Sequence, residues 1–293
     1  MLDAPESALA AWYPTVTGGP VPAADPADAL LAFVAERRDA VVARLRTRNT
    51  QTNETGRAAA LLPALHLVAA TAGRPLALLE LGASAGLNLR PDAFRVDYGT
   101  VATGPEDASV RMTCEVRGTA PLPAMSAPLG VADRRGVDLA PIDARDPIAA
   151  RWLTACVYPD LAERHARLAG ALALLRAEPV ALQRGDMVQA LPRLAAAAPA
   201  DTHLTVFHTW AVHYLAPEAK AALAAVLLAA SCERPLSWIA LEPRTTAVAL
   251  GMAEPGRDDA TILALAELRA GRRTDVALGL AHPHAIRIDW RAT

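Results

Sequence analysis

An acid and a run of small residues follow an apolar β pattern at residues 78–88. The order is Leu-Leu-Glu-Leu-Gly-Ala-Ser-Ala-Gly-Leu-Asn, so the acid is Glu80 and the glycines are Gly82 and Gly86. Glycine permits a tight turn and a close approach of the backbone to a ligand. The N–H groups that open the next helix favour a carboxylate or a phosphate. The segment therefore predicts a binding site for a nucleotide-like ligand.

Three further polar residues follow apolar segments in the same way. Asp138 ends the second predicted strand, Asp186 follows the third, and His208 ends the fourth. In a doubly wound sheet, the carboxyl ends of successive strands line one crevice. We therefore expect these side chains to converge with Glu80 on one ligand. Each acid taken alone also has a simpler reading, as a helix N-cap.

The same glycine turn also fits the nucleophile elbow of an α/β-hydrolase, with Ser84 as nucleophile. Asp186 or Glu242 would then orient the base, which would be His282 or His284. Two features disfavour this alternative. The elbow strand is expected to be the first of the sheet, and no His-Gly-Gly oxyanion segment precedes it.

Four polar residues, Gln51-Thr-Asn-Glu54, separate two apolar helical patterns. One interpretation is local capping, because Asn53 or Thr55 suits the N-cap of the helix that begins at Arg57. The other is that the segment folds over the crevice and contributes to a substrate site, since loops on rigid scaffolds carry binding groups. Both interpretations stay open at this point.

Hydrophobic periodicity predicts the elements that position these residues. Helical spacing runs through 29–48 and 57–71, and short apolar runs then alternate with amphipathic segments. This alternation indicates an α/β fold with a mostly parallel sheet. We expect a helical segment at residues 1–74, for which a lid is one interpretation. A domain with a hairpin insertion at 91–130 is expected at 75–293.

Within this domain, strands are expected at 76–81, 135–139, 180–184, 204–208 and 236–241. Helices are expected at 86–90, 147–177, 187–197, 217–231 and 258–270. A closing hairpin is expected at 276–281 and 285–290.

Composition excludes several classes of function. The formal net charge is −2 and the pI is about 6.4, so no overall charge attracts nucleic acid or anionic lipid. The three cysteines form no CxxC pair, which disfavours a disulfide framework or a thiolate zinc site. The apolar run at 221–232 is too short for a membrane span, and the first residues lack a signal-peptide pattern. We expect a cytoplasmic protein.

The series of strand ends resembles the class I S-adenosylmethionine-dependent methyltransferases over residues 75–290. That resemblance implies a Rossmann-like fold with a seven-stranded, mostly parallel sheet and a C-terminal hairpin. It implies S-adenosylmethionine as cofactor, with Asp138 on the ribose hydroxyls and Asp186 near the adenine amine. The methionine part would contact the first turn, at Glu80, Gly82, Ser84 and Gly86. Ser84 stands where the family has its middle glycine.

A closer resemblance covers nearly the whole chain. The segments Gln-Thr-Asn-Glu at 51–54, Glu-Leu-Gly-Ala-Ser-Ala-Gly-Leu-Asn-Leu at 80–89 and Phe-His-Thr at 207–209 resemble an uncharacterised bacterial family of unknown function. That family is regarded as a divergent branch of the methyltransferase fold, and it implies no particular substrate.

These interpretations predict a methyltransferase that acts on a small molecule, with no nucleic-acid or membrane partner. His208 is the first candidate for the general base and Glu54 the second. Gln51, Asn53, Trp210 and His213 are the candidate substrate contacts. No metal is expected, because two histidines five residues apart share a helical face poorly. A non-catalytic protein that keeps the cofactor pocket is the alternative from another class.

Overall fold

The computed structural model describes residues 1–118, 120–256 and 259–292. Within them the chain forms a nine-stranded sheet, in the order β5-β12-β11-β10-β9-β8-β1-β6-β7, and a small sheet in the order β3-β2-β4. The strands of the large sheet are β1 (Leu76–Leu81), β5 (Glu115–Arg117), β6 (Val131–Asp138), β7 (Ala181–Arg184), β8 (His203–Thr209), β9 (Leu236–Pro243), β10 (Thr261–Arg269), β11 (Arg272–Ala281) and β12 (Arg287–Trp290). The five strands expected between 76 and 241 are confirmed, although β6, β8 and β9 are longer than expected.

One half of the large sheet is parallel. Strands β7, β6, β1, β8 and β9 pair in register and in the same direction. Going along the chain, the order runs outward from β1 through β6 to β7, then returns to the other side of β1 through β8 to β9. The order therefore reverses between β1 and β8. In open α/β sheets, ligands bind outside the carboxyl ends of the strands at such a switch point.

The other half of the sheet is antiparallel. Strands β10, β11 and β12 follow β9 as a meander, and β5 pairs parallel to β12 at the far edge. The closing hairpin is confirmed, but the helix expected at 258–270 is wrong over Thr261–Arg269, and residue 258 lies outside the described residues. The segment is buried on both faces of the sheet, so Leu and Ala fill both faces and no polar alternation marks it as a strand.

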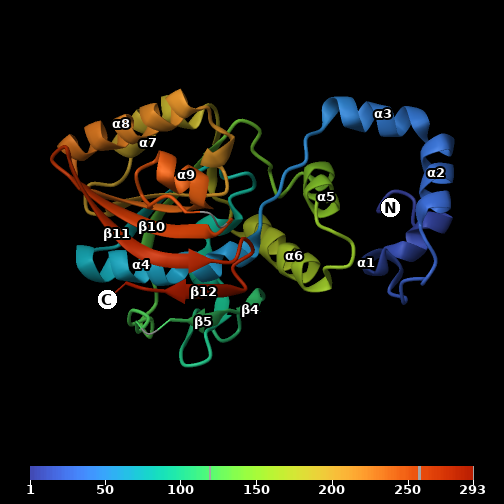
Figure 1. The fold of residues 1–293 in the computed structure, drawn as a ribbon, viewed down its shortest axis with the longest axis horizontal. Helices are drawn as coiled ribbons and strands as arrows, with labels where there is room; N and C mark the ends of the chain where they lie inside the picture. The colour runs from blue at the N-terminus through green and yellow to red at the C-terminus, as the bar shows by residue number, and fades with distance from the viewer. Residues whose placement is uncertain (119, 257–258, 293) are drawn as a thin grey trace.

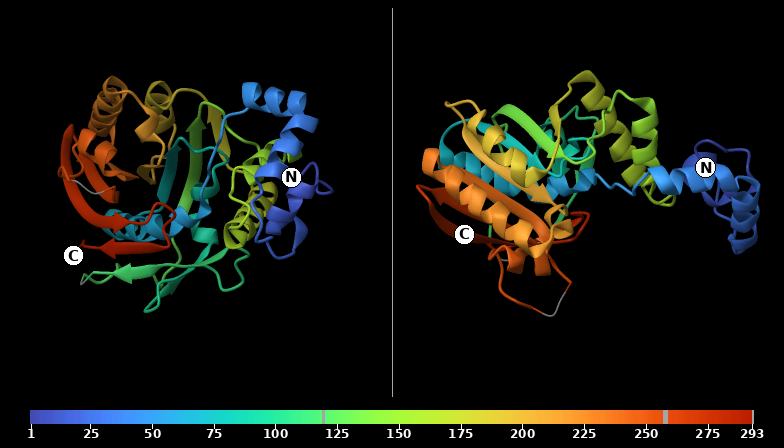
Figure 2. Two further views of the ribbon diagram at one scale, coloured as in Figure 1. Left: turned by 45° about the vertical axis from the view of Figure 1, so that its right-hand side comes forward. Right: turned by 90° about the horizontal axis from the view of Figure 1, so that it is seen from above.

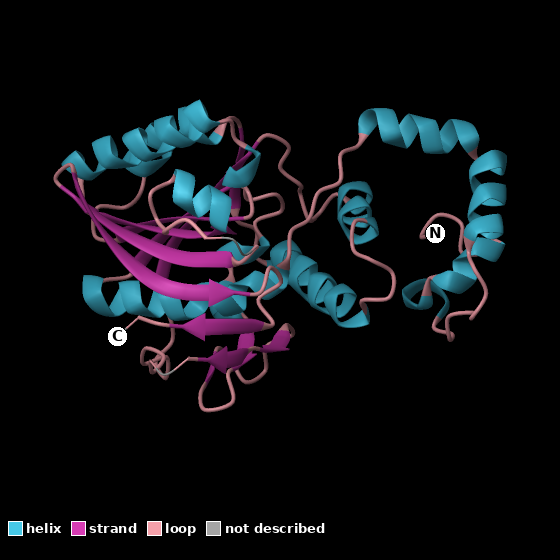
Figure 3. Ribbon diagram, viewed as in Figure 1, coloured by secondary structure: helices cyan, strands magenta, loops and turns pink. Residues whose placement is uncertain are grey.

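Helices cover both faces of the sheet (Figures 1 and 3). Helices α7 (Met187–Ala196), α8 (Pro217–Glu233) and α9 (Arg244–Ala249) share one hydrophobic core with the sheet, and α4 (Ala58–Ala72) packs on the opposite face. A third core joins α5 (Pro147–Ala155) and α6 (Ala162–Ala177) to the turn after β1. The single helix expected at 147–177 is thus two helices, because Pro159 lies in the break.

Residues 91–130 form more than the expected hairpin. Strand β2 (Arg95–Asp97) pairs antiparallel with β3 (Ala102–Thr103) and parallel with β4 (Arg111–Thr113), while β5 leaves this group and joins the large sheet. The described residues also form five short 3-10 helices: η1 (Ala8–Trp12), η2 (Thr55–Arg57), η3 (Leu87–Leu89), η4 (Pro91–Ala93) and η5 (Val212–Tyr214).

The first 50 residues lie beside the sheet domain rather than on it (Figure 2). They contain α1 (Pro14–Thr17), α2 (Ala27–Glu36) and α3 (Arg38–Thr47), and neither α2 nor α3 has a buried residue. Leu31 and Leu45 are 67% and 77% exposed. Helix α4, in contrast, is part of the main core.

Among the described residues, no helix combines the length and the apolar character that crossing a bilayer requires.

Candidate functional site

The turn after β1 is held tightly against its neighbours. Gly82 and Gly86 have φ values of +73° and +76°, and Ser84 has φ +52°, a conformation that non-glycine residues rarely adopt. The Gly82 and Ala83 amides both donate to the Val137 carbonyl, at 2.8 and 3.1 Å. A Cβ on Gly82 would lie 2.4 Å from Cβ of Ala211, which follows β8. The ends of β1 and β8 therefore meet at the switch point.

Asp138 fastens the end of β6 to this turn. Its Oδ2 accepts a hydrogen bond from the Ser84 amide and its Oδ1 accepts one from the Ala140 amide, both at 2.8 Å. The side chain is only partly buried. Because a carboxylate offers about four lone-pair sites, it can still accept hydrogen bonds from a ligand.

Glu80 is a buried acid without a full set of partners. Its Oε2, the Ser84 Oγ and both polar atoms of the Asn88 amide make no hydrogen bond within the described chain. Burial raises the pKa of Glu80 well above its ordinary value; the Asn88 amide, which is near the carboxyl but outside hydrogen-bond geometry, opposes this shift, and the Asp138 charge adds to it. Buried polar groups are hydrogen-bonded in the great majority of cases. These exceptions at the end of one strand are therefore available to form hydrogen bonds with a ligand.

Asp186 has a local structural role. Its Oδ1 accepts from the Val188 and Gln189 amides, at 2.9 and 3.0 Å, and caps the N-terminus of α7. This is the simpler of the two readings of this acid. A contact of Asp186 with a cofactor stays a prediction.

His208 is fully buried and both of its ring nitrogens are engaged. Nδ1 lies 2.8 Å from Oε1 of Glu242, and the Trp238 indole donates to Nε2 at 2.9 Å. These contacts fit the neutral tautomer with the proton on Nδ1. Neither nitrogen is left to take a proton from a substrate, so the geometry does not favour His208 as the general base.

Glu242, at the end of β9, anchors the segment after β8. The same Oε1 accepts from the Ala211 and Val212 amides at 2.9 and 3.0 Å, which caps η5. Burial opposes its charge, but the hydrogen bonds from His208 and the backbone, together with the nearby His213 ring, outweigh burial and lower the pKa of Glu242 to about 2. Glu242 is therefore a buried carboxylate that stays ionised.

The structure does not bring Glu80 and His208 together. Glu80 is opposite Phe207 in the parallel register of β1 and β8, and the side chains of consecutive residues alternate between the faces of a sheet. Phe207 lies in the core with α4, whereas Trp238, the partner of His208, lies in the core with α7 and α8. Glu80 and Asp138 thus lie on the face of the sheet that α4 covers, and His208 and Glu242 lie on the opposite face. We call these two faces, at the switch point, its first side and its second side.

The Gln51–Glu54 segment reaches across to both strand ends on the first side. Asn53 Oδ1 accepts from the Ala85 and Leu87 amides, at 3.2 and 3.3 Å, and Gln51 Nε2 donates to the Ala140 carbonyl at 3.1 Å. The capping role expected for Asn53 or Thr55 is taken by Glu54, whose Oε1 accepts from the Gly56 amide at 2.9 Å. The segment therefore lies against the turn after β1.

Replacing Asn53 with Ala should lower the free energy of unfolding by about 1–3 kcal/mol, because two buried amides lose their acceptor. Asn53→Asp keeps an acceptor oxygen and should cost less. Thr52→Ala, at an exposed neighbouring position, is the matched control and should leave stability unchanged. Urea unfolding measures all three, and an Asn53→Ala variant as stable as Thr52→Ala would show that the contact is not formed.

Arg57 connects three segments of the site: its own, the end of β8 and the turn between β11 and β12. Its Nη1 donates to the Thr209 carbonyl at 3.0 Å and its Nε to the Pro283 carbonyl at 3.2 Å, while its guanidinium lies 5.8 Å from the Trp210 ring centre. Burial lowers the pKa of Arg57, and the charge of Glu54 is the largest influence that opposes this shift. The turn between β11 and β12 is thereby held at the carboxyl edge.

Glu54 is enclosed by basic groups. It forms ion pairs with Arg164 and Arg167 of α6, and its Oε2 lies 3.5 Å from Nδ1 of His284. Only 3% of its side chain is exposed. As a candidate base, Glu54 would have to act from within these ion pairs, which makes a structural role the better fit.

His213 and Trp210 face each other beside Glu242. Their rings are 5.4 Å apart, edge to face, and Trp210 has φ +52°. Nδ1 of His213 lies 3.6 Å from Oε2 of Glu242, and 23% of the His213 side chain is exposed. His213 therefore combines an accessible ring with an adjacent carboxylate.

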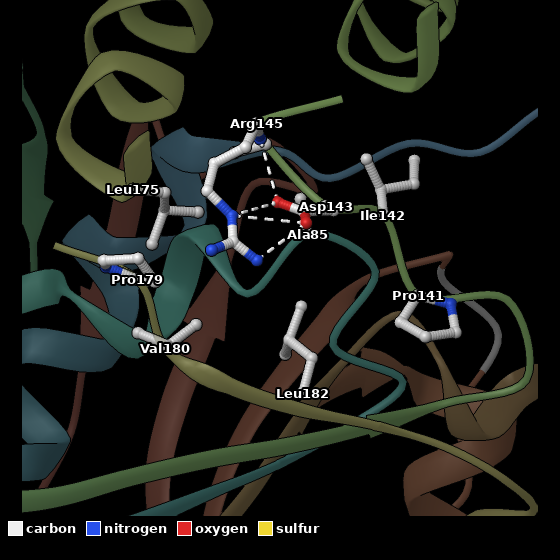
Figure 4. A pocket seen from close by; sticks show the side chains of 10 residues that line it. Ala85, Pro141, Ile142, Asp143, Arg145, Leu175, Pro179, Val180 and Leu182 are labelled. Atoms are coloured by element: carbon white, nitrogen blue, oxygen red, sulfur yellow. Dashed lines mark hydrogen bonds and ion pairs between the residues drawn. The ribbon is translucent and has the colours of Figure 1, made fainter. Parts of the chain in front are cut away.

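A cavity of about 210 Å³ opens beside the turn (Figure 4). It lies between the turn, the loop after β6 and the end of α6; Ala85, Ile142 and Leu182 line it, and the Asp143–Arg145 ion pair is at its rim. Neither Glu80, Asp138 nor Asp186 lines it. Cavities for cofactor-sized ligands usually measure roughly 300–1,000 Å³, so this cavity is too small to hold such a ligand alone.

Within the described residues, Ser84 Oγ has no hydrogen-bond partner, so no histidine is in place to activate it. His284, one of the two bases considered for a hydrolase, faces Glu54 instead. The hydrolase alternative gains no support from this geometry.

Four residues of the site were missed or undervalued in the sequence: Arg57, Asn88, Glu242 and His284. Glu242 carried the same signal as Glu80, an acid at the end of an apolar strand. Arg57 was visible as a charge at the start of an apolar helix. The position of His284 could not be predicted, because it depends on how the turn between β11 and β12 packs against Glu54 and Arg57.

The described residues contain no group of three His, Cys, Asp or Glu side chains placed to hold a metal ion.

A family model described as "Uncharacterized protein conserved in bacteria (DUF2332)" matches residues 1–290. No curated protein and no solved structure matches the chain.

Proposed function

This chain belongs to that uncharacterised bacterial family, and we propose that it binds S-adenosylmethionine at the carboxyl edge of its parallel strands and transfers the methyl group to a small molecule. The observation that carries the proposal is the group of buried, unpartnered polar atoms on Glu80, Ser84 and Asn88 beside the switch point. The positive φ of Ser84 and Trp210, one at each side of this point, is typical of strain at functional sites.

The residues on the first side of the switch point fit the cofactor. Asp138 has lone pairs left for the two ribose hydroxyls, and Glu80 and Asn88 supply unpartnered groups for the polar amino-acid portion. The tight turn at Gly82 lets the backbone approach the ligand. When bound, the cofactor supplies an electrophilic methyl group on a sulfonium.

The residues on the second side fit the acceptor. We propose His213, rather than His208, as the base: Nε2 would take the proton of the nucleophile, and the Glu242 carboxylate, 3.6 Å from Nδ1, would stabilise the resulting imidazolium. Trp210 would form an apolar wall for the substrate. His208 keeps Glu242 in position through its Nδ1 contact. The net charge of −2 and the accessible His213 fit a small-molecule substrate better than nucleic acid.

Calorimetry with S-adenosylmethionine, S-adenosylhomocysteine and NAD tests the proposal. The first two should bind with one site per chain, and NAD should not. Asp138→Asn should weaken binding by about 1.5–3 kcal/mol, the usual cost of a lost hydrogen bond to a charged group. Asp39→Asn is the matched control, because this exposed acid lies on α3 in the first 50 residues, and it should not change the affinity.

A wild-type protein that gives no heat and no thermal shift with either ligand at millimolar concentration would refute the proposal. Equal losses of affinity in the two variants would refute the assignment of Asp138. Because Asp138 also holds the turn, the melting temperature of each variant must be measured alongside its affinity.

A further inference from the structure

A second, larger cavity lies at the opposite end of the sheet. Its volume is about 850 Å³, within the range of small-molecule sites. Arg74 precedes β1, His203 opens β8 and Arg234 precedes β9, so the cavity is at the amino ends of the parallel strands. The turn from β10 to β11 closes it with Arg269 and Arg272. We call it the amino-end cavity.

Four arginines from three segments converge on this cavity. Arg234 is fixed in the wall, where it donates to the carbonyls of Ala198, Pro199 and Thr202 at 2.8, 3.1 and 2.7 Å. The other three, Arg74, Arg269 and Arg272, are exposed, and their side chains form no hydrogen bond or ion pair with the described residues. Three guanidinium groups thus line a concave space, and none of them is in an ion pair with a described residue.

A network of neutral and acidic groups forms part of the cavity lining. Ser237 is fully buried; its Oγ lies 2.8 Å from Nε2 of His203 and donates toward both carboxylate oxygens of Glu267, at 2.9 and 2.8 Å. With the Ser237 proton directed to Glu267, Nε2 of His203 carries a proton. Ordered donors and acceptors of this kind give a site specificity beyond charge.

The arginines of the cavity also act on the pKa of His203. Burial, followed by the charges of Arg74, Arg234 and Arg269, lowers the pKa of His203 to about 4. Burial raises the pKa of Glu267, with opposition from Ser237 and Arg269. The only other acid of the lining is Glu233, so four arginines face two acids.

We propose that the amino-end cavity is a second binding site, for a small polyanion that carries phosphate or carboxylate groups. Guanidinium groups bind both anions through paired, charge-assisted hydrogen bonds. The three exposed arginines would hold the anionic groups, and the His203–Ser237–Glu267 network would contact a neutral polar part of the ligand. Because the overall net charge is −2, the protein as a whole does not attract polyanions, and the attraction of an anion to this cavity comes from the arginines that line it.

Titration with inorganic pyrophosphate and with citrate tests this site and identifies the preferred anion. Isothermal calorimetry should show saturable binding with one site per chain for at least one of them. Arg269→Gln combined with Arg272→Gln should weaken that binding about tenfold or more, as expected for lost charge-assisted contacts. The matched control is Arg46→Gln, which removes an exposed arginine of α3 and should leave the affinity unchanged.

Nuclear magnetic resonance of the histidine rings localises the site. Pyrophosphate or citrate should shift the His203 signals and leave those of buried His208 in place. Absence of saturable binding by both probes, or equal affinity of the double variant and the wild type, would overturn the proposal. Asp138→Asn should not affect anion binding, so failure of the proposed function and failure of this inference are distinguishable.

Discussion

Replacing Glu242 with Ala should lower the free energy of unfolding by about 3–5 kcal/mol, the cost of breaking a buried charged network by removing one partner. The change removes the acceptor of the His208 ring and of two backbone amides at once. Glu242→Gln retains an acceptor oxygen and should cost less. Urea unfolding gives the free energies, and Glu218→Ala, on the first turn of α8, is the exposed control.

The pH dependence of stability gives a second measure of Glu242. Its folded pKa, about 2, lies below the ordinary value of 4.5, so the folded chain binds this proton less readily than the unfolded chain. The stabilisation is full above about pH 4.5 and is lost as the pH falls toward 2. In Glu242→Gln the loss over this range should be smaller than in the wild type. A Glu242→Ala variant within 1 kcal/mol of the wild type would contradict the anchoring role.

Replacing Glu80 with Gln should raise stability by about 1–3 kcal/mol at pH 7.5 and weaken S-adenosylmethionine binding. Burial raises the pKa of Glu80, so the folded chain holds a proton that the unfolded chain releases. Wild-type stability therefore falls as the pH rises above about 4.5, and Gln removes this loss. A residue that costs stability and is essential for binding is characteristic of a functional site.

Thermal unfolding at pH 7.5 and pH 5 separates the two contributions. The gain in Glu80→Gln should be large at the higher pH and small at the lower one. Glu163→Gln, which removes an exposed acid of α6, is the matched control and should show no such dependence. A Glu80→Gln variant that is less stable than the wild type at pH 7.5 would mean that the carboxylate is satisfied in the fold.

The parallel half of the sheet was predictable because its strands are short apolar runs that end in turns. Strand β1 was found at its observed bounds, Leu76–Leu81, and β7 began one residue later than expected. The antiparallel half was harder to predict from the sequence. Strand β10 is buried on both faces, so its Leu and Ala residues carry a helical propensity that the sheet overrides.

The site was only partly predictable for a geometric reason. The sequence shows that an acid follows a strand, but not which face of the sheet it occupies relative to a neighbouring strand. That relation depends on the register between strands, and a shift of one residue reverses it. Glu80 and His208 were therefore expected together, although the observed register of β1 and β8 separates them.

Long-range contacts of polar side chains were the least predictable. Asn53 was expected either to cap a helix or to face the crevice, and its two hydrogen bonds go to amides beyond residue 84. The bond from Arg57 to Pro283 joins the first core helix to the last hairpin. No local pattern contains information about such a pair, because it exists only after the sheet has formed.

The pairing of β5 with β12 has a consequence for synthesis of the chain. Arg287 is in register with Glu115, and the chain between them includes all of β6 to β11. While a ribosome makes the protein from its N-terminus, β5 has no strand to pair with until nearly all of the chain has emerged. Its open edge is then available to other nascent chains. Closing so long a loop also carries an entropic cost that slows folding, so the β5–β12 pair forms late.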